Sequence, residues 1–286
     1  MTTSYYYSKN ILKKISSKLK FLTVLAGVFL TQLSYAHISE GHERLEKEAY
    51  ELLKSQLATG NLPSGLDIYN YLVLKGIIKN DDNANSAYPD LDLGRQFLSD
   101  RQIFHFMADN RYVVDALRQF NTLETQKQYV LQKALPDCLN MIYTLFREVV
   151  DNPEGANKAG RGIYVLMHAI MDSYSSEHTI RDPLTFDLVT IKSWQLSRLY
   201  WPKGTKIKDV KQPGRAQTLV FLHTNAGLGD KEWENESGAL NKDAIQAVKA
   251  VKDLLVTIYS ALLDKEKEEM LIKSYITLIL NQNMPL

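Results

Sequence analysis

The stretch GIYVLMHAIMDSYSSEHT, residues Gly162 to Thr179, decides the fold of this chain. It starts as an apolar helix and carries three side chains of metal-ligand types, His168, Asp172 and His178. His168 and Asp172 are four residues apart, so both side chains leave the same helix face one turn apart. A histidine and a carboxylate on a buried helix are costly unless something pairs with them. The partner is either a metal cation or, more simply, a hydrogen bond between the two side chains.

The length and composition indicate a single domain with a full hydrophobic core. A chain of 286 residues can form one large domain or two small ones. No internal repeat, low-complexity tract or break in composition divides residues 37–286, so we expect them to form one helical domain.

The charge is unevenly distributed along the chain. The whole sequence has 34 basic and 33 acidic residues, but residues 1–36 contain five lysines and no acid. The remainder therefore has 29 basic against 33 acidic residues, a formal net charge of −4. Because general nucleic-acid affinity needs a basic surface, no stable nucleic-acid partner is expected. An anionic substrate has to be held by local cations or by metal.

The opening segment is typical of a secretory signal peptide over residues 1–36. A lysine-rich start is followed by the apolar run Phe21 to Leu30 and by small and polar residues that end at Ala36. The apolar run is short for a membrane span, although an uncleaved anchor is the alternative. We therefore expect export to the periplasm or the medium. The single cysteine, Cys138, cannot form an intramolecular disulfide, and bound metal is another source of rigidity.

Apolar periodicity predicts an all-α fold for the rest of the chain. Pro136 is expected to bend or split the longest helix. The segment from Asp182 to Gln217 is richer in Pro, Gly and aromatic residues and is interpreted as irregular, with room for short strands, and Asn225 to Gly238 is interpreted as a loop. Helices are predicted over His42–Ala58, Pro63–Ile78, Arg111–Phe120, Thr122–Val150, Lys242–Leu263 and Lys265–Leu280, besides the helix that begins near Gly162.

The chain contains six histidines, and each lies beside a small or apolar run or at the candidate mature terminus. A histidine in an apolar cluster, such as His105, is more often a satisfied core residue than a ligand. Those near residue 37 could simply belong to a polar chain end. The functional interpretation is that they join Asp90 and Asp172 in a set of nitrogen and oxygen ligands, which zinc prefers. One zinc needs three or four ligands, so this set of eight side chains suits more than one ion. Its six histidines are His37, His42, His105, His168, His178 and His223.

The spacing His168-x3-Asp172-x5-His178 on an apolar helix resembles the signature of the zinc-dependent phospholipase C family and of the related zinc-dependent single-strand nucleases. Those enzymes are all-helical and use three zinc ions. The first residue of their mature chain binds metal through its α-amino and carbonyl groups. Here a first residue followed by Gly41 and His42 at positions five and six is similar to the nuclease branch.

The resemblance implies a trinuclear zinc site with two to three bound ions. One zinc is implied at four side chains: Asp90, His105, His168 and Asp172. A second would take the amino and carbonyl groups of His37, with His42 and Asp172, which makes Asp172 a bridge. The third would use His178, His223 and a carboxylate.

Three positions depart from the family pattern. The family's first residue is normally Trp, and here it is His37. The family has an acid four residues after its last histidine, where this chain has Gly227, so we assign Asp230 as the substitute ligand, with Glu232 as the alternative. Two places of the aromatic box that holds choline in the lipase branch are Leu91 and Gln102. The third zinc ligand and the lipid headgroup therefore stay open.

The implied chemistry is hydrolysis of a phosphodiester by a zinc-generated hydroxide, which zinc makes available near neutral pH. Asp90 would orient or deprotonate the attacking water, and Arg181 either holds phosphate or is an ordinary surface residue. The sequence contains no G-x-S-x-G or P-loop motif to supply a different nucleophile or phosphate cradle. We expect a secreted phospholipase C that acts on phospholipid, with contact at a membrane surface. A single-strand nuclease and a helical exported zinc-binding protein without catalysis are the alternatives.

Overall fold

The computed structural model describes residues 41–79, 102–152, 162–176, 178–193, 233–235 and 237–280. The predicted signal peptide lies outside these ranges, as do four predicted ligands: His37, Asp90, His223 and Asp230. The described part of the chain is mostly helical and includes one two-stranded sheet. The predicted helical class is therefore confirmed, in the coarse form of a mainly helical fold.

The helix bounds follow the sequence prediction closely. Residues 41–54 form the first described helix, which stops short of the predicted end, and a small bridge between Thr59 and Leu62 follows it. The later helices are α2 (Gly65–Leu74), the 3-10 turn η3 (Gln102–His105), α4 (Asn110–Gln119), α5 (Leu123–Asp151), α7 (Gly162–Asp172), α9 (Lys242–Leu263) and α10 (Glu268–Leu280). No helix in the described residues is long and apolar enough to cross a membrane.

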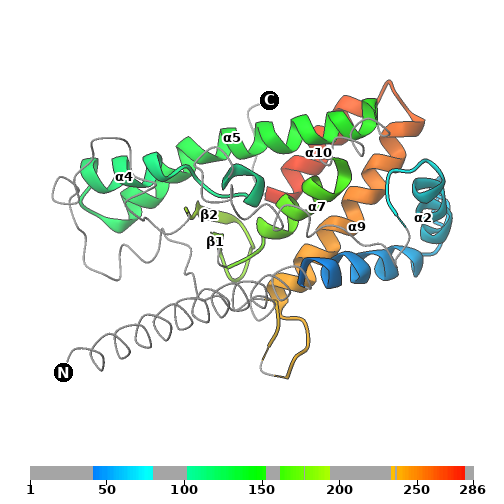
Figure 1. Ribbon diagram of the computed structural model, residues 1–286, viewed down its shortest axis with the longest axis horizontal. Coiled ribbons are helices and arrows are strands. Elements are labelled where there is room, and N and C mark those ends of the chain that lie inside the picture. Colours follow the sequence, from blue (N-terminus) through cyan, green and yellow to red (C-terminus); the bar gives the residue numbers. More distant parts are fainter. Residues whose placement is uncertain are drawn as a thin grey trace, which may run out of the picture.

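Helix α7 lies at the centre of the fold, between α5 and α9 (Figure 1). All 11 of its residues are buried, which agrees with a helix that is apolar on every face. It also contacts η3. A polar side chain on α7 is therefore shielded from water within the described residues and finds its partners among the neighbouring elements.

Helix α5 runs without a break from Leu123 to Asp151 and contains Pro136. The split that the sequence allowed at this proline does not occur. A proline removes one backbone hydrogen bond and crowds the carbonyl one turn before it. Pro136 lies on the exposed side of α5, as does Gln132 one turn earlier, so water can reach the carbonyl that loses its partner. The opposite side of the helix carries the core residues, such as Cys138 and Ile142.

A short antiparallel hairpin follows the central helix. Strand β1 (Thr179–Arg181) pairs with β2 (Leu188–Ile191), and Thr179 lies opposite Ile191. The segment just beyond β2 joins this hairpin to η3. The Lys192 N–H donates to the His178 carbonyl at 2.7 Å, and the Lys192 carbonyl accepts from the Ala108 N–H at 2.8 Å. The hairpin thus fixes the backbone around His178 against the backbone that follows His105.

Candidate metal centre

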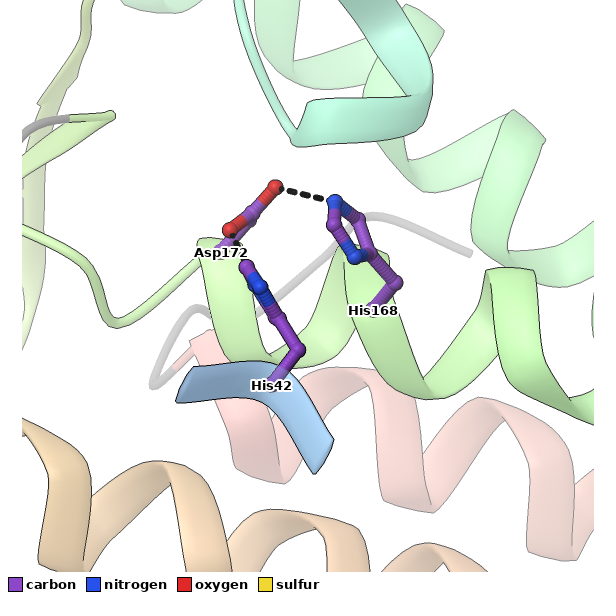
Figure 2. Close-up of side chains that lie close together, drawn as sticks. All are labelled: His42, His168 and Asp172. Carbon is purple, nitrogen blue, oxygen red and sulfur yellow. Dashed lines mark hydrogen bonds and ion pairs between the residues drawn. The ribbon is translucent and has the colours of Figure 1, made fainter. Parts of the chain in front are cut away.

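The carboxylate of Asp172 is surrounded by imidazole rings. Its Oδ1 lies 2.9 Å from His42 Nε2, and its Oδ2 lies 2.9 Å from His168 Nε2 and 3.1 Å from His105 Nδ1. His178 Nδ1 is 3.5 Å from the same Oδ2. Figure 2 shows His42 reaching Asp172 from the first helix, while His168 and Asp172 project from neighbouring turns of α7. Residues far apart in the sequence thus converge on one buried carboxylate.

The turn that carries His105 ends in a left-handed residue. The Met107 N–H donates to the Gln102 carbonyl at 3.1 Å and the Phe106 N–H to the Ile103 carbonyl at 3.0 Å, with Phe106 at φ 49°. This is the Schellman pattern, in which glycine usually takes the left-handed position. The buried Phe106 ring offsets the strain of that conformation. The tight turn directs the His105 side chain toward α7.

Three ligand atoms form a small triangle at this place. His105 Nδ1 and His168 Nε2 are 2.9 Å apart, and each lies within 3.1 Å of Asp172 Oδ2. Ligands bonded to zinc at about 2.05 Å in a tetrahedron are about 3.3 Å from one another. The triangle is close to one face of such a tetrahedron, so it has the right size for a small cation.

Protons alone satisfy this triangle poorly. A neutral imidazole carries one N–H, and a carboxylate oxygen only accepts. If both His105 Nδ1 and His168 Nε2 carried hydrogens aimed at Oδ2, two N–H groups would crowd each other at a nitrogen separation of 2.9 Å. If only one did, a single hydrogen would serve three close contacts. A cation that accepts a lone pair from each of the three atoms removes the conflict.

A second set of ligands faces the other carboxylate oxygen. His42 Nε2 contacts Oδ1, and the His42 ring stacks on the His168 ring with centroids 4.0 Å apart. His42, His168 and Asp172 each offer a ligand atom, and these atoms lie within 4.8 Å of one another. All three residues are buried. This group could hold a metal ion. Only His42 lies at Oδ1, because the Nε2 of His168 lies at Oδ2.

His178 is held by a backbone carbonyl. Its Nδ1 donates to the His105 carbonyl at 2.7 Å, which leaves the lone pair of the neutral ring on Nε2. Metal-binding histidines commonly make such a bond with the nitrogen that does not bind metal. Burial lowers the pKa of His178, against the opposing charge of Asp172, so the ring is neutral at pH 7.

The electrostatics of the cluster keep Asp172 ionised. Burial by itself would raise the pKa of this carboxyl group. The neighbouring imidazoles of His168, His178 and His42, with the hydrogen bond to His105, outweigh burial and hold the pKa well below its usual range. An ionised carboxylate is the state that binds a divalent cation.

Two other contacts frame the cluster. Trp233 is buried and meets the His42 ring edge-on, with centroids 5.9 Å apart, and the neighbouring Glu234 forms an ion pair with Arg44. Trp233 and Glu234 therefore pack on the helix that supplies His42. Sequence analysis gave Trp233 no role, and an isolated tryptophan in an otherwise polar loop was the only available signal.

Arg181 lies beside the cluster and is held by the protein. Its Nε donates to the Ser173 carbonyl at 2.8 Å, and its Nη1 to the Phe186 carbonyl at 2.7 Å. Its guanidinium carbon lies 4.2 Å from the centroid of the Tyr174 ring. These contacts fasten the turn after Asp172 to the hairpin. Binding of phosphate by Arg181 stays a prediction.

The structure brings together five of the predicted ligands: His42, His105, His168, Asp172 and His178. The other four lie outside the described residues, and their roles stay predictions: His37, Asp90, His223 and Asp230. No family model, curated protein or solved structure matches this chain. The function of the protein is therefore inferred from the geometry of this cluster.

Replacing Asp172 with Asn tests whether the carboxylate holds metal. The amide keeps the shape of the side chain but removes its charge and one of its two oxygens. We expect zinc affinity, measured by competition with a chromophoric chelator, to fall by more than the roughly 10- to 100-fold typical of outer-shell changes. Asp137→Asn, at an exposed carboxylate on α5, is the matched control and should leave affinity unchanged. Equal zinc affinity in Asp172→Asn and the wild type would show that this carboxylate holds no ion.

Replacing His178 with Gln tests its burial in the neutral form. The pKa of His178 in the folded protein lies below the value of about 6.5 for an exposed histidine. As the pH falls, the unfolded state therefore takes up this proton before the folded state does, which favours unfolding. The free energy of unfolding of the metal-free protein should therefore fall as the pH drops from 7 to 5. The variant lacks this contribution and should show a shallower decline in urea titrations over that range. A decline as steep in the variant as in the wild type would contradict the assignment.

Proposed function

We propose that this protein is a zinc-dependent phosphodiester hydrolase of the phospholipase C type. The observation that carries the proposal is the division of histidines between the two oxygens of Asp172. His42 lies at Oδ1, while His105 and His168 lie at Oδ2. A bridging aspartate of this kind is what the family resemblance implies for two of the three zinc ions.

The ligand chemistry supports zinc as the ion. Imidazole nitrogens with a carboxylate are typical zinc ligands, and the small triangle at Oδ2 suits a tetrahedral ion. Calcium and magnesium prefer sites made of oxygen atoms, which this cluster is not. Among the described residues the site has no thiol, since the only cysteine, Cys138, lies on the buried side of α5.

The roles of the side chains follow from this assignment. When bound, zinc supplies a hydroxide near neutral pH and neutralises charge on the phosphate oxygens. Asp172 and the three histidines at its oxygens would hold the ions. The burial of these ligands keeps water from competing for them. Asp90 is proposed to orient or deprotonate the attacking water, and the amino group of His37 to complete the second zinc.

Phospholipid is the substrate we propose. The formal net charge of −4 outside residues 1–36 disfavours a polyanionic substrate that must be gathered over a long surface. A phospholipid presents a single phosphodiester, which a compact metal cluster can hold without a basic surface. The nuclease alternative is favoured by one observation, the Gly41–His42 spacing.

Activity assays separate these functions. The zinc-loaded protein should hydrolyse phosphatidylcholine or another phospholipid in mixed micelles, and removal of zinc by a chelator should abolish the reaction until zinc is restored. Asp172→Asn should be as inactive as the chelated protein, because it weakens both ligand sets, and Asp137→Asn should retain full activity.

Other outcomes would contradict the proposal in different ways. Hydrolysis of single-stranded DNA without hydrolysis of phospholipid would identify the nuclease alternative. A protein that binds zinc but hydrolyses neither substrate would be a zinc-binding protein without this catalysis. Activity that resists chelation would rule out a zinc mechanism.

A further inference from the structure

A second buried carboxylate lies close to the proposed metal centre. Glu46 is 0% exposed, although glutamate is almost never fully buried without partners. It lies four residues after His42 on the first helix, so the two side chains project from the same face with Cβ atoms about 5 to 6 Å apart. A buried carboxyl group therefore lies within one helical turn of a proposed zinc ligand.

The two helices that meet at the site carry matching polar residues. On the first helix these are His42, Glu46 and Tyr50, and on α7 they are Tyr164, His168 and Asp172, in each case four residues apart. All six are buried. His42 meets Asp172 through a 2.9 Å contact and stacks on His168, which places the first turn of one helix against the last turns of the other. Glu46 lies one turn after His42 on the first helix, toward the part of α7 that carries Tyr164.

Contacts and charge fix Glu46 within this arrangement. The Tyr50 hydroxyl donates to Glu46 Oε1 at 2.5 Å, within the same helix. Burial, and then the charge of Glu46, raise the pKa of Tyr50. Burial, and to a smaller extent Glu46, also raise the pKa of Tyr164 on α7. The Tyr164 hydroxyl in turn accepts from the Lys79 N–H at 2.7 Å.

We infer that Glu46 is a positioning residue of the metal centre, whose buried negative charge raises the affinity of the site for a divalent cation. This inference rests on the proposed metal centre and extends it to a residue that does not itself bind the ion. In a water-poor interior a charge one turn away acts on the cation with little screening. The Tyr50 hydroxyl fixes the carboxylate, and the shared helix couples its position to that of His42.

The test compares three variants of the full chain by zinc affinity and by thermal stability with and without zinc. Glu46→Gln keeps the size of the side chain and an acceptor for Tyr50 but removes the charge. Its zinc affinity should fall by about tenfold, at the lower end of outer-shell effects. The rise in melting temperature caused by zinc should shrink with it. Glu46→Asp, which keeps the charge, should recover part of the affinity.

The matched control is Glu48→Gln, the same change two residues along the same helix at an exposed position. It should bind zinc like the wild type. If Glu46 served only to stabilise the fold, Glu46→Gln would lower the melting temperature equally with and without zinc and leave affinity unchanged, and that result would overturn the inference while leaving the metal centre intact. A wild-type protein that binds no zinc would overturn both.

Discussion

Asp172 brings a full negative charge into a part of the protein from which water is excluded, and three imidazoles lie within about 3 Å of its two oxygens. Such a charge is stable only when its surroundings supply compensating charge or hydrogen bonds. The described structure meets that requirement by bringing residues 42, 105 and 168 to one point. The first helix, η3 and α7 therefore meet at this carboxylate.

The apolar core explains why the cluster can be so compact. Helix α7 is buried on every side, so His168 and Asp172 meet only groups that the neighbouring elements present. The Schellman turn at Phe106 and the backbone bonds through Lys192 set the position of His105 and His178 before any ligand is considered. A preorganised group of this kind binds a cation without first having to rearrange, which favours affinity.

The features that sequence analysis predicted correctly depend on local spacing. The apolar run of α7 and the four-residue interval from His168 to Asp172 are visible in the sequence, and α9 spans the predicted Lys242–Leu263. The features it missed depend on contacts between distant segments. The sequence could not show which oxygen of Asp172 each histidine faces, nor that Trp233 packs on His42. Continuity of α5 through Pro136 also depends on which side of the helix faces water. Glu46 combines both kinds of feature. Its four-residue spacing from His42 is visible in the sequence, but its burial depends on contacts with distant segments.

The central claim is that the two oxygens of Asp172 bind two different zinc ions. Anomalous diffraction at the zinc absorption edge, from crystals of the protein grown with zinc, measures this directly. The account predicts two anomalous peaks at Asp172, one bonded to Oδ1 with His42 and one bonded to Oδ2 with His105 and His168. A map with no peak at this carboxylate, and with imidazole nitrogens still in direct contact with both oxygens, would contradict it.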